Sequence, residues 1–508
     1  MADLTDPLAA RREKLARLRA AGVDPYPPRF SRSHQAAEVL ERFAELEEDA
    51  SVRVAGRLQS LRPMGKTTFG HIEDASGRVQ IYARRDQLGE KGYRLLKTID
   101  LGDFLGVRGS VFRTRMGEIS IRVEELVILA KSLRPMPVVK ERDGERYDTF
   151  QDREARYRQR YLDLMLNPET RETFRQRSRT IAALRRLLDA RGFLEVETPV
   201  LQLVYGGALA RPFRTHHNAL GLDLYLRIAE ELPLKKLIVG GLERVYEIGR
   251  VFRNEGLDRH HNPEFTMLEF YWAYADYRDA MDLVEEMLRA VAREVCGGLE
   301  IAWGEHQIDL EPPFARRSMM ELIREATGEQ VLEQDAETLR ATCRRLEAEM
   351  PPDASRGKLI EKIFDLAVAP ALVQPTFVTD HPKLVSPLAK SHRDDPERLV
   401  ERFELFVGGQ ELANAFSELN DPEEQRRRFE QQGALRAAGD EEAHPLDEDY
   451  LMALEHGMPP AAGVGIGVDR LVMLLTGAEA IRDVLLFPHM RPRTRGAAPA
   501  APTDRGEA

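Results

Sequence analysis

Residues 250–277 read RVFRNEGLDRHHNPEFTMLEFYWAYADY, and the rest of the chain is arranged around this stretch. Apolar and polar residues alternate on both sides of a loop, 254–263, that is rich in Gly, Asp, Asn and Pro. Alternation with a period of two is typical of half-buried strands, and the loop composition is typical of a turn. The segment therefore predicts an antiparallel hairpin in which Leu268, Phe270 and Trp272 share one face.

The opposite face of this hairpin is rich in ionisable side chains. It is predicted to bring together Arg253, Glu255, His260, His261, Phe265, Glu269 and Tyr271. Ionisable groups that are buried without partners cost several kcal/mol each. Such a face is therefore either exposed to water and internally salt-bridged, or built to hold a charged ligand.

The length and composition indicate a soluble protein with more than one domain. The chain has 508 residues, of which 31% are charged and 43% hydrophobic, so it is long enough for two or more domains. No apolar run approaches the roughly 18 residues that a membrane span needs, and the N-terminus lacks the apolar block of a secretory signal. Cys296 and Cys343 are the only cysteines, which excludes a disulfide framework or zinc cluster and predicts a cytoplasmic location.

The charge is distributed unevenly along the chain. The formal net charge of −11 argues against a general nucleic-acid binder, and no DNA partner is expected. Residues 51–135 nevertheless contain 16 Lys and Arg against 9 Asp and Glu, a balance of +7 that leaves −18 for the remainder. The same segment consists of short alternating strands separated by Gly, the pattern of a small barrel. We therefore expect a five-stranded OB-fold suited to single-stranded RNA.

Three aromatic residues of this barrel could either stack on RNA bases or fill its core. Phe69 follows the polar run 65–68, so an exposed position is expected for it. For Tyr82 and Phe112 a core position is favoured.

The pattern along the chain predicts five parts: a helical extension (1–50), the OB-fold (51–135), a linker with a connecting helix (136–165), a larger domain with a helical insertion (166–492) and a disordered tail (493–508). In the larger domain, a helix at 180–191 ends at Gly192 and precedes a strand at 193–198. The charged, mostly helical stretch 276–374 shows no chemical motif and is interpreted as a structural insertion.

Two carboxylates are expected to meet on a second hairpin. Gly408-Gly409 can form a two-residue turn, which would place Glu404 opposite Ala413 and bring Glu404 and Glu411 onto one face. Paired carboxylates suit a hard cation, and Mg²⁺ is the expected one. A bulge near Ala413 is required if the side chains of opposite parity, Asn414, Phe416 and Glu418, are to join the same site.

A glycine-rich strand closes the domain. In AGVGIGVDRLVMLL, the spacing of Gly463, Gly465 and Gly467 would let the backbone approach a ligand. Arg470 lies at the start of the following helix, where a cation opposes the helix dipole. It therefore has a role other than stabilising the helix.

Three of these segments together resemble the signature motifs of class II aminoacyl-tRNA synthetases. They are helix–strand–Pro (180–199), RVFRNEG with HNPEFTMLE (250–269), and GVGIGVDRLVMLL (463–475). The version here is most similar to the bacterial lysyl-tRNA synthetases of subclass IIb, and the resemblance covers nearly the whole chain. It implies an α+β fold, in which the OB-fold precedes an antiparallel-sheet catalytic domain with flanking helices, and a homodimer.

The resemblance also implies a two-step reaction with ATP, L-lysine and the tRNA for lysine. The lysine carboxylate attacks the α-phosphorus of ATP and releases pyrophosphate, and the adenylate then passes lysine to the terminal adenosine of the tRNA. The protein accelerates such a reaction mainly by positioning the substrates and neutralising their charge, and it contributes little covalent chemistry of its own.

Site residues follow from the same resemblance. Catalysis and ATP binding are assigned to Arg253, Glu255, His261, Phe265, Gly467 and Arg470. Lysine binding is assigned to Gly207, Glu231, Glu269, Tyr271, Asn414, Phe416 and Glu418. Mg²⁺ is assigned to Glu404 and Glu411, and the anticodon to Phe69, Gln80 and Glu118. One departure stands beside Glu231: the family usually has a proline before this residue, and here Pro233 follows it.

Three other interpretations remain open on the residues. An aspartyl- or asparaginyl-tRNA synthetase shares the architecture, but an aspartyl enzyme would need a cation for the substrate side chain. A lysyl transferase acting on a translation factor would lack the barrel. An inactive RNA-binding paralogue would be expected to have lost Arg253, Glu411 or Arg470, and all three are present.

Overall fold

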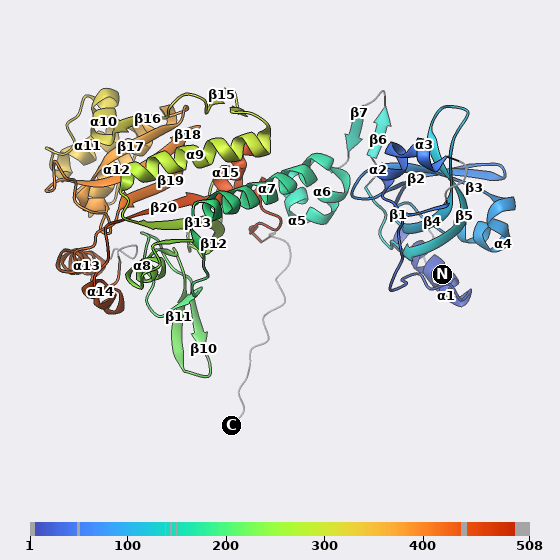
Figure 1. Ribbon diagram of the computed structural model, residues 1–508, viewed down its shortest axis with the longest axis horizontal. Helices are drawn as coiled ribbons and strands as arrows, with labels where there is room; N and C mark the ends of the chain where they lie inside the picture. Colours follow the sequence, from blue (N-terminus) through green and yellow to red (C-terminus); the bar gives the residue numbers. More distant parts are fainter. Residues whose placement is uncertain are drawn as a thin grey trace. The chain divides into compact units, whose positions relative to one another are not determined.

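The computed structural model describes residues 6–47, 51–137, 139–142, 145–148, 150–437 and 444–492. The tail predicted to be disordered, 493–508, lies outside these residues. The chain forms two compact units, Met1–Gln151 and Asp152–Ala508, and each is described by itself (Figure 1). Within the described residues, no helix is both long and apolar enough to cross a membrane.

The N-terminal unit is built on a closed five-stranded barrel, as the sequence predicts. Its strands run in the order β1-β2-β3-β5-β4, with bounds β1 Ser51–Met64, β2 Thr67–Glu73, β3 Arg78–Arg84, β4 Phe104–Arg113 and β5 Ile119–Ala130. Alternate residues such as Val52, Val54 and Leu58 are fully buried, which follows from the period of a strand with one face on the core. The remaining elements are α1 Pro7–Ala20, α2 Ala36–Glu41, α3 Phe43–Leu46, α4 Arg85–Leu96, β6 Val139–Arg142 and β7 Glu145–Asp148.

The C-terminal unit contains an eight-stranded sheet. Its order is β16 (Ala315–Ser318), β17 (Thr376–Pro382), β18 (Leu399–Val407), β19 (Gln410–Ser417), β20 (Ala461–Gly467), β13 (Glu264–Ala273), β12 (Arg244–Phe252) and β8 (Leu194–Glu195). Neighbouring strands are antiparallel except at the two ends, where β16 and β8 are parallel to their neighbours. The predicted hairpin is β12–β13, paired from Arg244 with Trp272 to Phe252 with Glu264. The α+β architecture is thereby confirmed.

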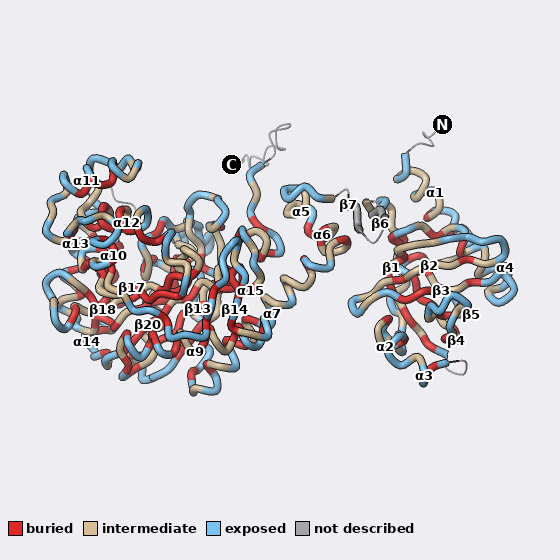
Figure 2. The backbone as a smooth tube through the Cα atoms, turned by 90° about the horizontal axis from the view of Figure 1, so that it is seen from above, coloured by how far each residue is buried: buried red, intermediate tan, exposed pale blue. Residues whose placement is uncertain are grey.

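Helices pack against one face of this sheet, and the hydrophobic core lies between them and the sheet. These are α7 (Pro168–Ala190), α9 (Tyr277–Cys296) and α15 (Val468–Thr476), which pack with Leu268 and Phe270 of β13. Figure 1 shows α7 and α9 along the sheet, and Figure 2 shows the buried segments concentrated in its strands. Because successive side chains of a strand alternate, Glu269 and Tyr271 are directed to the opposite face.

Other elements complete the unit. They are α5 (Arg153–Arg158), α6 (Arg160–Leu166), α8 (Glu231–Val239), α10 (Met319–Thr327), α11 (Ala336–Arg345), α12 (Arg356–Ala367), α13 (Pro422–Ala437), α14 (Glu448–Glu455), the sheet of β9 (Leu201–Gln202), β10 (Arg214–His217) and β11 (Leu222–Leu226), and the hairpin of β14 (Glu300–Trp303) and β15 (His306–Asp309).

Two boundaries differ from the sequence prediction. The helix expected at 180–191 begins twelve residues earlier, at Pro168, because proline is well tolerated in the first turn of a helix. The strand expected at 193–198 is reduced to Leu194–Glu195. Within the stretch interpreted as an insertion, α9 belongs to the main core, whereas α10, α11 and α12 form an apolar cluster of their own.

Candidate active site

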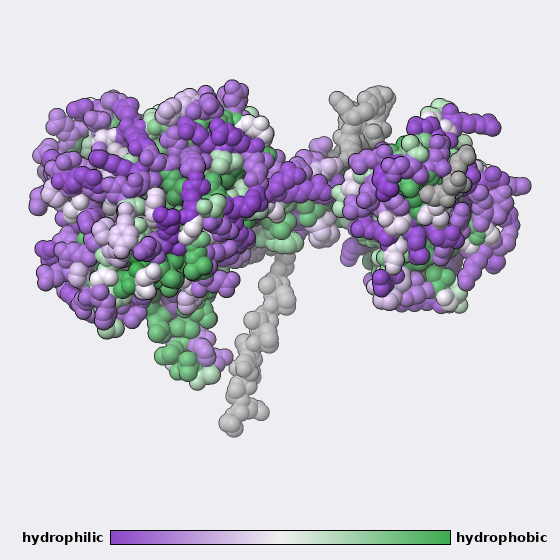
Figure 3. Space-filling view, in the orientation of Figure 1, coloured by the Kyte–Doolittle hydropathy of each residue, from purple (hydrophilic) through white to green (hydrophobic). Residues whose placement is uncertain are grey.

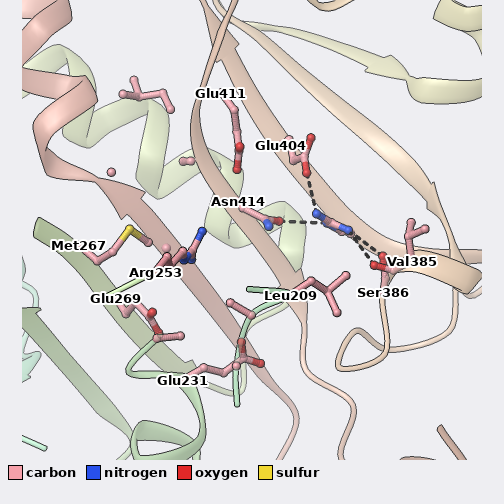
Figure 4. A pocket seen from close by; sticks show the side chains of 18 of the residues that line it. Leu209, Glu231, Arg253, Met267, Glu269, Val385, Ser386, Glu404, Glu411 and Asn414 are labelled. Carbon is pink, nitrogen blue, oxygen red and sulfur yellow. Dashed lines mark hydrogen bonds and ion pairs between the residues drawn. The ribbon is translucent and has the colours of Figure 1, made fainter. Parts of the chain in front are cut away.

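A cavity of about 580 Å³ opens on the sheet face that α7 and α9 do not cover. Figure 4 shows Arg253 in its middle, with Glu231 and Glu269 on one side and Glu404, Glu411 and Asn414 on the other. Of the predicted site residues of this unit, those that line the cavity are Gly207, Glu231, Arg253, Glu255, His261, Phe265, Glu269, Tyr271, Glu404, Glu411, Asn414, Phe416, Gly467 and Arg470. Glu418 is the exception, because it is buried behind the lining.

Two cations, Arg253 and Arg470, line the part of the cavity around Phe265; we call this part the cationic end, although Glu255 and Glu411 also lie near them. The Arg253 guanidinium lies over the Phe265 ring, 5.1 Å from its centroid. Burial lowers the pKa of Arg253, although the carboxylates of Glu255 and Glu411 oppose this effect. Among the described residues, no carboxylate forms an ion pair with Arg253. A half-buried guanidinium without an anionic partner is arranged to receive one from a ligand.

Arg470 is positioned by backbone and side-chain contacts. Its Nη1 donates to the Glu411 carbonyl oxygen at 2.6 Å and lies 3.4 Å from the Glu411 carboxylate. The His261 ring lies 3.4 Å from Nη2 and is held from its other side by Asp258, whose Oδ2 is 2.8 Å from Nδ1. Burial would raise the pKa of Asp258, but hydrogen bonds from His261 and two backbone N–H groups keep it below its ordinary value. The ring is therefore held by an ionised carboxylate.

The two predicted metal-binding carboxylates lie on facing strands of one hairpin. The expected bulge is present, one residue before Ala413: the register shifts so that Phe406 pairs with Glu411 and Leu405 with Ala413. Glu404 therefore faces Asn414, not Ala413 as predicted. The extra residue explains how side chains of opposite sequence parity reach one cavity.

Arg402 was missed by sequence reasoning. Its guanidinium donates to Glu404 Oε1 at 2.6 Å, to Asn414 Oδ1 at 3.0 Å and to Ser386 Oγ at 2.9 Å (Figure 4). It joins β18, β19 and the connection between β17 and β18. A basic residue two positions from Glu404, and so on the same strand face, is the signal that could have found it.

The interpretation of 276–374 as purely structural is also wrong in part. One face of α12 lines the cavity through Lys358, Glu361, Lys362 and Asp365. Burial raises the pKa of Glu361 to about 7, and burial with the nearby Glu404 raises that of Asp365 to about 6. The spacing of three and four residues places these groups on one helix face, opposite the buried Ile360 and Phe364.

Carboxylates gather at the other end of the cavity. Glu269 is buried; its Oε1 accepts the backbone N–H of Glu230 at 3.1 Å and its Oε2 accepts from the Tyr271 hydroxyl at 3.4 Å. Burial, and next the charge of Glu231, raise the pKa of Glu269 to about 7. Burial also raises the pKa of Glu231, although Lys235 opposes it. Anions whose pKa values are raised in this way gain most from a cationic ligand.

The start of α8 explains the displaced proline. Glu231 is the first residue of this helix, and Pro233 lies in its first turn, where the missing N–H has no helical partner. Glu230 and Glu231 are both buried, so they are not the solvated acids that a simple interaction with the helix dipole would produce.

Two glycines make room for the carboxylate end. Gly207 has φ +89°, and a Cβ there would lie 2.9 Å from the Cβ atoms of Ala229 and Glu231. A Cβ at Gly463 would lie 2.0 Å from Oε1 of Glu418 and 2.4 Å from the Tyr271 ring. The glycine spacing in β20 was expected to bring backbone close to a ligand; at Gly463 the space is filled by protein side chains instead.

The predicted RNA-reading residues lie together on the barrel. Glu118 accepts from Gln80 Nε2 at 2.5 Å, and Phe69 faces Tyr82 across β2 and β3, with ring centroids 5.0 Å apart. Tyr82 is 5.5 Å from Phe112. These rings are half-buried and lie outside the apolar core of the barrel, so the core position favoured for Tyr82 and Phe112 is wrong.

Comparison with known proteins agrees with both units. Residues 152–491 match the family of class II tRNA synthetases for D, K and N, and residues 52–129 match the OB-fold nucleic-acid-binding domain. A Pelotomaculum thermopropionicum protein named lysine–tRNA ligase is 54% identical over 494 residues, covering 97% of this chain and 96% of that protein. A Bacillus subtilis protein of the same name is 51% identical over 498 residues, covering 97% and 98% respectively.

Proposed function

The chain belongs to the lysine–tRNA ligases of the class II aminoacyl-tRNA synthetases, and from this premise we propose how its residues divide the work. The enzyme activates L-lysine with ATP and transfers it to tRNA. The observation that carries our assignment of the site is that one cavity holds Arg253, Arg470 and Phe265 in one part and the buried carboxylates of Glu231 and Glu269 in another. Those two ends match a polyphosphate and a diammonium amino acid.

The cationic end is assigned to ATP. Phe265 would stack on adenine, and Arg253 would contact the α-phosphate and the attacking lysine carboxylate. Glu255 and His261 would orient the nucleotide, and Arg470, at the edge of the cavity beside Gly467, would cover the phosphate tail. Fixed cations directed at the site where negative charge develops are a large source of rate enhancement.

The family acts on ATP together with a divalent metal ion, and Mg²⁺ is the ion that we assign to Glu404 and Glu411. Among the described residues, no group of three or more His, Cys, Asp or Glu side chains could hold a metal by itself. Two carboxylates fit Mg²⁺ because this ion is commonly bound through one or two carboxylates plus substrate phosphates. The metal would neutralise phosphate charge next to Arg470.

The carboxylate end is assigned to lysine. Glu231 would bind the α-ammonium, and Glu418 with Tyr271 would bind the ε-ammonium; Glu269 would add negative charge, and Phe416 would flank the aliphatic stem. Asn414 and Gly207 complete the lining. In the barrel, Phe69, Gln80 and Glu118 are assigned to the anticodon of the lysine tRNA, and a cytoplasmic location follows from these partners.

An apolar surface supports a homodimer. Large apolar side chains are exposed on β8 to β11 and their connections: Leu194, Val200, Leu201, Leu203, Val204, Leu209, Leu220 and Leu222. Figure 3 shows a hydrophobic surface over the β10–β11 arm. A contiguous exposed apolar surface of this kind is typical of an association site, and a second copy of the chain is the proposed occupant.

The assignment is tested by amino-acid-dependent pyrophosphate exchange. The parent protein should exchange pyrophosphate with lysine in preference to each of the other amino acids. Arg253→Met should lower kcat by about 10²–10³, the usual effect of removing one donor that stabilises the transition state. Arg250→Met is the matched control, since Arg250 is exposed on β12, three residues before Arg253, and its replacement should leave the exchange rate unchanged. Equal rates for both variants would contradict the assigned site.

A further inference from the structure

Lys235 is buried directly behind the carboxylate end of the cavity. It lies one helical turn after Glu231 on α8, is fully inaccessible to solvent and does not line the cavity. Its Nζ is 2.5 Å from Oε1 of Glu231, forms an ion pair with Oε2 of Glu418, and lies 5.2 Å from the centre of the Phe416 ring. The protein's own ammonium thus contacts three of the residues that we assign to the substrate lysine.

Each carboxylate uses one oxygen for Lys235 and keeps the other. Oε2 of Glu231 lies 3.6 Å from the position that a Cβ at Gly207 would occupy, on the cavity side. Oε1 of Glu418 points to Gly463 beside the Tyr271 ring. Neither oxygen of this carboxylate has a hydrogen-bond partner among the described residues, and Oε2 is the oxygen that forms the ion pair with Lys235. A buried, unpaired carboxylate oxygen is costly unless a ligand satisfies it. Lys235 therefore fixes two carboxylates without using up their capacity to bind.

The charges at this end add up to a specific requirement. Glu231, Glu269 and Glu418 are three buried carboxylates, and Lys235 is the ammonium that contacts two of them. Burial alone would lower the pKa of Lys235, but Glu231 and Glu418 raise it above its ordinary value, so the side chain stays charged. When all three carboxyl groups are ionised, two negative charges remain unmatched, and free lysine carries two ammonium groups.

We propose that Lys235 is a positioning and specificity residue, whose buried ammonium holds Glu231 and Glu418 in place and sets the charge of the pocket to match a diammonium amino acid. The inference rests on the proposed assignment of lysine to this end of the cavity. Lys235 contacts no substrate; it acts through Glu231 and Glu418. Besides these two, the titratable groups that interact with Lys235 are Tyr450 on α14 and His444 just before it. Arg402 of β18 interacts with Glu231, Glu269 of β13 with Glu418, and Tyr271 of β13 with both carboxylates.

The test is the pH profile of lysine activation in Lys235→Met, measured by pyrophosphate exchange. Without the ammonium, Glu231 and Glu418 should hold protons up to a higher pH. We expect kcat/KM for lysine to fall at least thirtyfold at pH 7. The pH at which kcat/KM reaches half its maximum should move up by at least one unit, and KM for ATP should stay unchanged. Lys236→Met is the matched control: Lys236 is the next residue on α8, pairs with Asp449 at the surface and should alter none of these values.

A purely structural role predicts a different result. It would lower the amount of active enzyme and leave the pH midpoint where it is, and that outcome overturns the proposal. If Lys235→Met does not fold, Lys235→Ala is prepared in n-propylammonium or in n-propanol. Activity that returns only with the ammonium supports the proposal, whereas equal recovery in both, or recovery in neither, refutes it.

Measuring the parent protein alongside the variants separates a failure of the assigned lysine site from a failure of the role proposed for Lys235. Absence of lysine-dependent exchange in the parent would overturn the assigned site itself. A parent that activates lysine, together with Lys235 variants that keep its pH midpoint, would overturn the role of Lys235 alone.

Discussion

Raising the pH from 6 to 8 should tighten lysine binding about tenfold. The reason is Glu269, which is buried with Glu231 nearby and whose pKa is raised to about 7. A lysine ammonium binds the ionised form. Below pH 7 the carboxyl is mostly protonated and this contribution is lost; above pH 7 it is present. At pH 6 about a tenth of the protein has Glu269 ionised and at pH 8 about nine-tenths, which gives the tenfold ratio.

The assay is isothermal titration calorimetry with lysine and no ATP, in pairs of buffers that differ in ionisation enthalpy. Near pH 7, binding should release about half a proton from Glu269. Glu231 and Glu418 also have raised pKa values, so their contribution has the same sign and can only increase the effect. Glu269→Gln should bind more weakly and show a flatter pH dependence. A dissociation constant that is flat or rises between pH 6 and 8 would refute the electrostatic reasoning for this pocket.

Three other predictions concern the lysine pocket, the barrel and the exposed apolar surface. Glu418→Gln leaves Lys235 with one anionic partner. Because breaking a buried pair costs about 2–5 kcal/mol, kcat/KM for lysine should fall roughly thirtyfold to a few thousandfold, with KM for ATP unchanged. An unaltered kcat/KM for lysine would mean that the pocket is misassigned. Phe69→Ala should weaken tRNA charging by the ~1–3 kcal/mol of one base stack while pyrophosphate exchange stays constant, and a parallel loss in both would show that the ring supports the fold instead. Leu203→Glu should yield a monomer by light scattering while Met116→Glu, at an exposed site on the barrel, stays dimeric; a parent protein that is monomeric at micromolar concentration would disprove the interface.

Local pattern was enough to predict the elements that carry the site. The period-two alternation around 254–263 fixed both the β12–β13 hairpin and the face on which Glu269 and Tyr271 lie, because a strand offers only two faces. The Gly408-Gly409 turn determined the pairing of β18 with β19 in the same way, and the need for a bulge followed from the parity of Asn414 and Phe416. Most of the predicted site residues thus lie on elements that local pattern predicts, while the roles assigned to them come from the family resemblance and stay predictions.

What the tertiary structure alone decided is which distant groups meet and how deeply they are buried. The ion pair of Lys235 with Glu418 joins residues far apart in the sequence, and no spacing rule relates them. The polar face of α12 lines the cavity only because its apolar face packs on a cluster of its own, and this packing cannot be inferred from periodicity. Burial then sets the chemistry: the same carboxyl group has an ordinary pKa in water and a raised one at Glu269, since desolvation depends on everything that surrounds it.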